Sequence, residues 1–322
     1  MATKTFVLGA GFSVGAGFPL VRNLRAEVLR FMETTTDPLL RRLIDPRLPE
    51  FPTGQVRGVI HAVDPEARMG FEELLFALRP TRSRDPVSAT AFALRSACAK
   101  LLWQKQEALE TLPVSYRNFA SWLNESHFPG PRNAVISLNW DLLAERALDD
   151  NGVPWGYSGL QPVPVIKPHG SINWSQHRQP ACSSWQPISP GSPYCYIPTD
   201  PNDPASIGPF SDPFPDGVNE DLRYMVFPGD PEDEDAVLQI WAETEQVIRA
   251  RDVVVFIGYS LPLYDARARE CFRRSTSGKT VEVFNRSVEM LENYRNFLSL
   301  ASVVTTEPIS FENCPYAQNL CK

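Results

Sequence analysis

Two polar residues of this sequence are of types that do chemistry on sugars and protons, and each follows an apolar run. Asn139 stands in the segment SLNWD, and His169 stands in KPHG. Histidine is the usual proton acceptor near neutral pH, and an Asn and an Asp at a strand end bind ribose hydroxyl and carboxamide groups. Each also has a structural alternative: Asp141 is a good N-cap for the helix LLAERAL that follows it, and His169 fits a hydrogen-bonded structural histidine.

A glycine-rich turn is the third candidate. The stretch FVLGAGFSVGAGFP places glycines at 9, 11, 15 and 17, between an apolar run and a helical pattern that begins at Leu20. Glycines in such a turn let the backbone approach a pyrophosphate, and the following helix offers free N–H groups. The spacing is not G-x-G-x-x-G, and Glu27, near the place of the ribose-binding acid of a dehydrogenase, falls inside the helix. The turn therefore indicates a site for a dinucleotide, but not the site of a dehydrogenase. The alternative is a tight structural turn.

Two weaker candidates also follow apolar runs. The tripeptide GYS at 258–260 comes after DVVVFI, and Asn285 comes after VEVF. Their hydroxyl and amide groups suit a phosphate or a ribose.

The cysteines predict no metal site. They stand at positions 98, 182, 195, 271, 314 and 321, and no two form a C-x-x-C pair. A structural zinc ion needs four ligands, usually in short paired spacings. We therefore expect reduced thiols and no bound metal.

The composition is that of a folded globular chain. Of the 322 residues, 43% are hydrophobic and 21% are charged, which excludes a disordered chain, and the formal net charge of -7 argues against a broad nucleic-acid-binding face. No apolar run reaches the ~20 residues of a membrane helix, and the N-terminus reaches its glycines too soon for a signal peptide. We expect a cytoplasmic protein that contacts neither membranes nor nucleic acid.

The candidate residues must be positioned by strands. Short apolar runs predict strands near residues 4–8, 133–138, 163–174, 252–258, 280–284 and 301–307. Helical spacing predicts helices between most of them, and such alternation forms a mostly parallel sheet with helices on both faces. The predicted fold class is therefore α/β, with a Rossmann-like sheet. In this class the ligand lies outside the carboxyl ends of the strands, where strand order reverses, and the candidates stand at such ends.

The same patterns predict how the chain is divided. Four helical patterns occur between the first strand–helix unit and the second strand, without a convincing strand among them, so we expect a helical insertion there. The expected parts are a Rossmann-like core from 1–35, 129–175 and 232–308, the helical insertion over 36–128, a Pro-rich loop region over 176–231 and a C-terminal tail over 309–322.

Together and in this order, the motifs resemble the sirtuin family. GAGFSVGAGFP is similar to the sirtuin pattern G-A-G-I-S followed by S/A-G-I-P, SLNWD to T-Q-N-I-D, KPHG to L-H-G, and GYS to G-T-S, while Asn285 fits a late strand-end asparagine. Two departures stand out. Sirtuins carry Asp-Phe-Arg where this chain has Leu20, Val21 and Arg22, and they carry a zinc ribbon with two C-x-x-C pairs where this chain has its Pro-rich stretch, with VFPGD at 226–230 as a remnant of the acyl-lysine loop.

The helical insertion, with KPHGSINW and FIGYSLP, is similar to bacterial sirtuin-like domains of antiphage defence. This resemblance implies an NAD⁺ glycohydrolase that forms nicotinamide and ADP-ribose and depletes NAD⁺ during infection. It further implies a bacterial cytoplasmic protein that acts as a homo-oligomer or with a partner sensor or ATPase encoded alongside. NAD⁺ is then a substrate, and no metal takes part.

The resemblance also implies roles for single residues. Asn139 binds the ribose hydroxyls and the water, His169 is the general base, and Asp141 orients the carboxamide. The glycine turn and Ser260 hold the pyrophosphate and adjoining ribose. The NAD⁺-binding residues implied in this way are Gly9, Ala10, Gly11, Phe12, Ser13, Phe18, Pro19, Arg22, Asp141, Gly258, Tyr259, Ser260 and Asn285. Two alternatives stay open: a module that senses NAD⁺ or ADP-ribose and regulates a partner protein, and a zinc-less NAD⁺-dependent deacylase.

Overall fold

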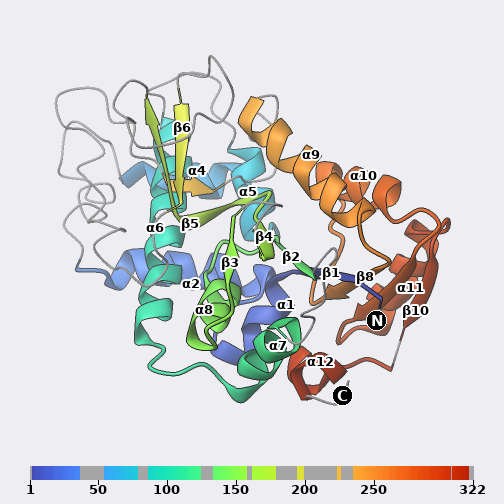
Figure 1. Ribbon diagram of the computed structural model, residues 1–322. Helices are drawn as coiled ribbons and strands as arrows, with labels where there is room; N and C mark the ends of the chain where they lie inside the picture. Colours follow the sequence, from blue (N-terminus) through green and yellow to red (C-terminus); the bar gives the residue numbers. More distant parts are fainter. Residues whose placement is uncertain are drawn as a thin grey trace.

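The computed structural model contains one large parallel sheet (Figure 1). It describes residues 2–36, 54–78, 86–124, 133–157, 162–178, 194–198, 223–225, 235–305 and 307–318. The strand order is β10-β9-β8-β1-β2-β4-β3, and every neighbouring pair is parallel. These strands are β1 Lys4–Leu8, β2 Ala134–Ser137, β3 Trp155–Gly156, β4 Val163–Ile166, β8 Val253–Ile257, β9 Thr280–Phe284 and β10 Ser302–Thr305.

Helices cover both faces of the sheet, as the alternation of buried side chains shows. Phe6 and Leu8 of β1 pack into one hydrophobic cluster, and Val7 between them packs into the other. The first cluster includes residues of α2 Val21–Thr34, α4 Gly54–Val63, α5 Phe71–Ala77, α6 Pro86–Ala108, α7 Val114–Asn124, α8 Leu143–Asp150 and α12 Pro315–Gln318. The second includes residues of α9 Asp235–Arg249, α10 Ala266–Ser275 and α11 Val288–Phe297. The predicted α/β class is therefore confirmed.

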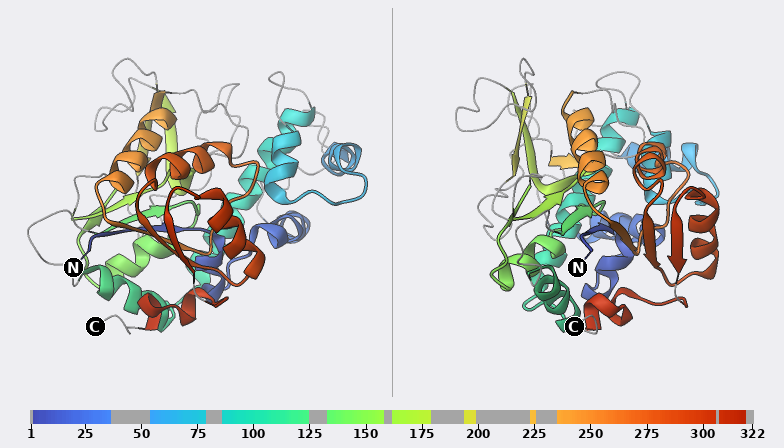
Figure 2. Two further views of the ribbon diagram at one scale, coloured as in Figure 1. Left: turned by 90° about the vertical axis from the view of Figure 1, so that its right-hand side faces the viewer. Right: turned by 45° about the vertical axis from the view of Figure 1, so that its right-hand side comes forward.

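The described residues between α2 and β2 lie in the region expected as a helical insertion. In the described residues of 54–124 every regular element is a helix, and α4 packs beside α6 at one end of the molecule (Figure 2, left). No helix within the described ranges has the length and apolarity needed to cross a bilayer.

A second, three-stranded antiparallel sheet occupies part of the region expected as Pro-rich loops. It consists of β5 Gly170–Arg178, β6 Tyr194–Pro198 and β7 Arg223–Met225, in the order β6-β5-β7. The strand expected over 163–174 is therefore two strands, β4 and β5, that belong to different sheets. The composition does not reveal β6, β7 or the second half of β5, because the prolines of this region lie between the strands or, like Pro198, at a strand end. The VFPGD segment lies outside the described residues.

Residues 309–318, expected as a tail, pack against the large sheet. Phe311, in the short helix η2 Phe311–Asn313, lies 4.4 Å from Phe12 between ring centroids, and Tyr316 lies 5.0 Å from Phe6. Both aromatic side chains are almost fully buried. The hydrophobic core beside β1 is therefore completed by the C-terminal segment.

The glycine turn after β1 lies against the end of β8. Its backbone folds into two short helices, α1 Ala10–Ser13 and η1 Val14–Ala16. The N–H groups of Gly9 and Gly11 donate to the carbonyl oxygens of Ile257 (3.0 Å) and Gly258 (2.9 Å). A Cβ atom on Gly11 would lie 2.7 Å from the Cα of Gly258, and one on Gly258, whose φ is +66°, would lie 2.5 Å from the backbone of Gly11. The two glycines therefore permit contact between two backbones, whatever else the turn binds.

We predict that Gly11→Ala lowers the free energy of unfolding by about 1–3 kcal/mol, because the added methyl group meets backbone that cannot move aside. Gly58→Ala is the matched control: Gly58 lies in α4 with open space around its Cα, so alanine there is expected to stabilise the helix by about 0.5–1 kcal/mol. Urea unfolding of the two variants measures both effects. Equal stability of the two variants would contradict the packing argument.

Candidate functional site

A cavity of about 370 Å³ lies at the carboxyl ends of the central strands. It is lined by residues that follow β1, β2, β4, β8 and β9. The sequence-predicted residues that line it are Gly9, Ala10, Gly11, Ser13, Phe18, Pro19, Arg22, Asn139, Asp141, His169, Gly258, Tyr259, Ser260 and Asn285. Segments far apart in the chain are therefore brought to one place, as expected for the ends of parallel strands.

Phe12 is the predicted residue that does not line this cavity. Its side chain is 1% exposed and packs against Tyr116 and Phe311, with ring centroids 5.0 Å and 4.4 Å away. The hydroxyl of Tyr116 donates to the carbonyl oxygen of Phe12 at 2.6 Å. Phe12 thus anchors the turn in the hydrophobic core, a role that a motif of small residues around an aromatic does not reveal.

The amide of Asn139 is held in one orientation. Its Nδ2 lies 3.0 Å from the carbonyl oxygen of Gly9 and 3.0 Å from the Oγ of Ser13. The oxygen of Gly9 can only accept a hydrogen bond, so the nitrogen of the amide must face it. Both N–H groups are then used inside the protein, and Asn139 presents its carbonyl oxygen as the group for a ligand. That oxygen can accept a hydrogen bond from a hydroxyl group or a water molecule.

Asp141 is held by two hydrogen bonds, one of them at the start of the following helix. Its Oδ1 accepts the N–H of Leu143 (3.1 Å) at the start of α8, and its Oδ2 accepts the hydroxyl of Ser13 (2.7 Å). Burial raises the pKa of Asp141, although the charge of Lys167 and the hydrogen bond from Ser13 oppose this effect. Asn139, Ser13 and Asp141 form one hydrogen-bonded chain across the turn and the end of β2.

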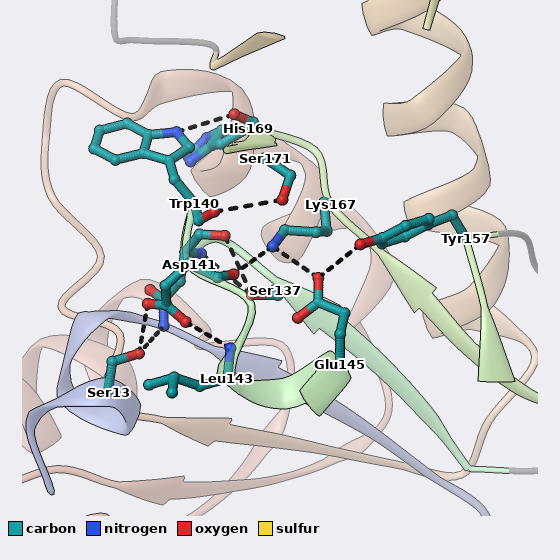
Figure 3. Close-up of polar contacts among 11 residues, drawn as sticks. Ser13, Ser137, Trp140, Asp141, Leu143, Glu145, Tyr157, Lys167, His169 and Ser171 are labelled. Atoms are coloured by element: carbon teal, nitrogen blue, oxygen red, sulfur yellow. Dashed lines mark hydrogen bonds and ion pairs between the residues drawn. The ribbon is translucent and has the colours of Figure 1, made fainter. Parts of the chain in front are cut away.

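A buried ion pair lies beside this chain, to its right in Figure 3. Lys167, which follows β4, donates to the backbone oxygen of Asp141 (2.6 Å) and to Glu145 Oε1 (2.8 Å), and both side chains of the ion pair are fully buried. Tyr157 donates to the same carboxylate oxygen at 3.2 Å. A lysine between Ile166 and Pro168 in an apolar strand end is the sequence signal that could have identified this pair.

His169 is held on three sides. Its Nε2 lies 3.3 Å from Asp265 Oδ1, and its backbone oxygen accepts the indole N–H of Trp140 at 3.0 Å (Figure 3). Its ring meets the edge of Trp241, with centroids 5.7 Å apart. The second oxygen of Asp265 accepts the hydroxyl of Tyr259 at 2.6 Å. The site therefore contains a histidine–aspartate pair with a fixed orientation.

Asp265 is ionised in this arrangement. Burial by itself raises its pKa, but the charge of His169 and hydrogen bonds from His169 and Tyr259 outweigh burial and hold the pKa below its usual range. An ionised carboxylate beside an imidazole fixes its tautomer and stabilises its protonated form. The sequence signal for Asp265 was its place before α10, whose first turn it caps through the N–H of Ala268.

The far end of the cavity is built on β8 and β9. Asn285 donates from Nδ2 to the carbonyl oxygen of Tyr259 (3.2 Å) and accepts the N–H of Ser287 (3.1 Å) through Oδ1. Much of its hydrogen-bonding capacity is therefore used to fix the loop. Ser260 is exposed, and Arg286 and Ser310 stand at the same end of the cavity.

Sequence reasoning missed several lining residues because their contacts are long-range. Glu72 comes from α5 of the helical insertion, Tyr264 from the loop before α10, and Phe311 from the C-terminal segment. None of them belongs to a local motif at a strand end. Trp140, by contrast, lies within SLNWD, and a tryptophan at such a strand end was a usable signal.

The described residues contain no group of three or more His, Cys, Asp or Glu side chains arranged to hold a metal ion. Cys98, Cys271 and Cys314 are buried free thiols. The side chains of Cys182, Cys195 and Cys321 lie outside the described part of the chain.

Solved structures of Sir2 enzymes are similar to this chain. A mutant Sir2 homologue in complex with ADP-ribose has 17% identity and a TM-score of 0.43, covering 99% of this chain and 93% of its own. Sir2Tm bound to a propionylated peptide has 15% identity and a TM-score of 0.42, with coverages of 99% and 91%. A structure described as the basis for the mechanism and regulation of Sir2 enzymes has 13% identity and a TM-score of 0.44, with coverages of 99% and 94%.

No protein-family model matches the sequence, and the search of curated proteins gives no match either. The role of each side chain therefore has to be argued from the geometry of this chain.

We predict that Lys167→Met lowers the free energy of unfolding by about 3–5 kcal/mol, because it leaves the carboxylate of Glu145 buried without its partner. The double variant Lys167→Met with Glu145→Met removes both charges and is expected to recover most of that loss. Urea unfolding of both variants tests this. If the double variant is less stable than the single one, the penalty does not come from the unpaired carboxylate.

Proposed function

We propose that this protein is an NAD⁺ glycohydrolase, which cleaves the bond between nicotinamide and ribose to release nicotinamide and ADP-ribose. The observation that carries the proposal is that the carbonyl oxygen of Asn139 and the His169–Asp265 pair belong to one cavity with the glycine turn. The turn and the helices after it suit a pyrophosphate. An acceptor oxygen and a base at the other end suit the ribose and a water molecule.

The chemistry needs little more than these groups. Cleavage of an N-glycosidic bond passes through an oxocarbenium-like state at the anomeric carbon, as in glycoside hydrolysis. The electron pair of the breaking bond goes to nicotinamide, which leaves neutral and needs no general acid. Water then forms the new bond to that carbon, and its proton goes to His169 and on to solvent.

The positions of the residues support separate roles. A histidine that donates through one ring nitrogen to Asp265 has its other nitrogen as the basic one. The oxygen of Asn139 accepts from a ribose hydroxyl or from the attacking water. Asp141, hydrogen-bonded to Ser13, faces the carboxamide, and the turn with Ser260 holds the pyrophosphate. We assign Asn285, which follows β9, to the adenosine side, because dinucleotides lie across the carboxyl ends of such strands.

The proposal extends to a biological role through the resemblance of the motifs. We propose a bacterial antiphage effector that depletes NAD⁺ when activated, as a homo-oligomer or with a partner sensor or ATPase. A module that senses NAD⁺ or ADP-ribose has the same cavity without turnover. A zinc-less deacylase would use the same cavity with an acylated lysine as the acceptor.

The first test is release of nicotinamide from NAD⁺ by the full chain, alone and with candidate partners or phage extracts. His169→Ala and Asn139→Ala are expected to lower the rate by about 10²–10⁴-fold, the usual contribution of a positioned proton acceptor and its partners. His61→Ala and Asn23→Ala, at exposed positions of α4 and α2, are the matched controls. Unchanged cleavage by both site variants would refute the assignment.

The two alternatives are distinguished by measuring ligand binding and the products formed. Binding of ADP-ribose in calorimetry without nicotinamide release under any condition indicates a sensing module. Release of acetyl-ADP-ribose only when an acetylated peptide is present indicates a deacylase.

We predict that Asp265→Asn lowers kcat by about 10²–10⁴-fold while the dissociation constant for ADP-ribose stays unchanged, because the amide cannot stabilise a protonated His169. Asp150→Asn, at a partly exposed position of α8, is the control. Steady-state kinetics and calorimetry measure the two quantities. A loss of ADP-ribose affinity with unchanged kcat would place Asp265 in ligand binding instead.

A further inference from the structure

Glu72 brings a carboxyl group of the helical insertion to the cavity. It stands in the first turn of α5 and lines the same cavity as His169 and Asp265. Acidic residues are common in first turns because they favour the positive end of the helix dipole. In α5 the capping carboxylate is that of the next residue, Glu73, whose Oε2 accepts the N–H of Gly70 at 2.9 Å. The inward position of Glu72 therefore has no capping role to explain it.

The surroundings of Glu72 hold its carboxyl group in place. The hydroxyl of Tyr264 donates a hydrogen bond to it. The other titratable groups that face it are His169, Asp265, Glu73, Cys98 and Tyr259. Burial raises the pKa of Glu72, while the hydrogen bond from Tyr264 and the charge of His169 lower it by less. A half-buried carboxylate that lines the same cavity as the carboxylate of Asp265 lowers the stability of the fold, which points to a use beyond structure.

The proposed reaction can use a carboxylate at this place in the cavity. Positive charge develops on the ribose at the anomeric carbon, and a fixed negative group nearby stabilises it. In glycoside hydrolysis the hydroxyl next to that carbon also forms hydrogen bonds that strengthen in the transition state. We propose that Glu72 is the carboxylate that accepts this ribose hydroxyl and stabilises the oxocarbenium-like state, so that the helical insertion completes the active site. This inference rests on the proposed function.

The isosteric variant Glu72→Gln tests it. We expect kcat for nicotinamide release to fall by about 10²-fold, while the dissociation constant for ADP-ribose, which lacks the positive charge, stays unchanged. Because the charged form of Glu72 lowers stability, Glu72→Gln is also expected to raise the Tm near pH 8. A structural glutamate would show the opposite result, a lower Tm with unchanged kcat. Glu66→Gln, at a 63% exposed side chain, is the control and should change neither quantity.

The pH profile gives a second readout. The ionised form of Glu72 is the active one, so the rate of the wild type falls as pH drops through the raised pKa of Glu72. Protonation of His169, the proposed general base, also lowers the rate at low pH. Glu72→Gln loses the part of the acid limb that belongs to Glu72 and keeps the part that belongs to His169. Tyr264→Phe removes the hydrogen bond that lowers the pKa of Glu72, so its acid limb moves to higher pH. An acid side of the profile that is identical in both variants and in the wild type overturns the assignment.

The outcomes separate this inference from the proposed function. If the wild type releases no nicotinamide under any condition, both proposals fail. If the wild type cleaves NAD⁺ and Glu72→Gln cleaves it at the same rate, only the proposed role of Glu72 fails. The helical insertion then lines the cavity but contributes no group to the reaction.

Discussion

The contact between two backbones at the end of the central strands is the constraint on which the site depends. Gly11 and Gly258 lie so close that neither position has room for a Cβ atom. This contact joins the turn after β1 to the end of β8. From the joined backbone, the oxygen of Gly9 fixes the amide of Asn139, and the oxygen of Tyr259 accepts the amide of Asn285. The glycines thus position polar groups at both ends of the cavity.

Three carboxyl groups line this cavity, and each is held by different partners. Asp141 is held by a hydroxyl and a helix N–H, Asp265 by an imidazole and a phenol, and Glu72 by a phenol. The pKa of Asp265 lies below its usual range, whereas those of Asp141 and Glu72 lie above theirs. Environments that push the pKa values of neighbouring acids apart are typical of sites that move protons.

The sheet and the strand-end residues could be predicted from the sequence because their signals are local. Each strand of the large sheet that carries a candidate residue is a short apolar run, and Asn139 and His169 follow such runs directly. The partners of these residues could not be predicted in the same way. Asp265 reaches His169 across 96 positions of the sequence, and Glu72 arrives from an insertion whose pattern indicates only helices. The second half of β5 and the strands β6 and β7 were hidden by the Pro-rich composition of this region. The place of Phe12 depends on Phe311, almost 300 positions later in the sequence.

The packing of Phe311 on Phe12 and of Tyr316 on Phe6 has a consequence for biosynthesis. A ribosome releases Phe6 and Phe12 long before the aromatic residues that cover them, so the core beneath the glycine turn stays open until synthesis reaches the C-terminal segment. Domains fold as units once their contacts are available. The cavity is therefore assembled only after residues 309–318 have emerged, and a nascent chain without them carries all the candidate catalytic residues but lacks the core that positions them.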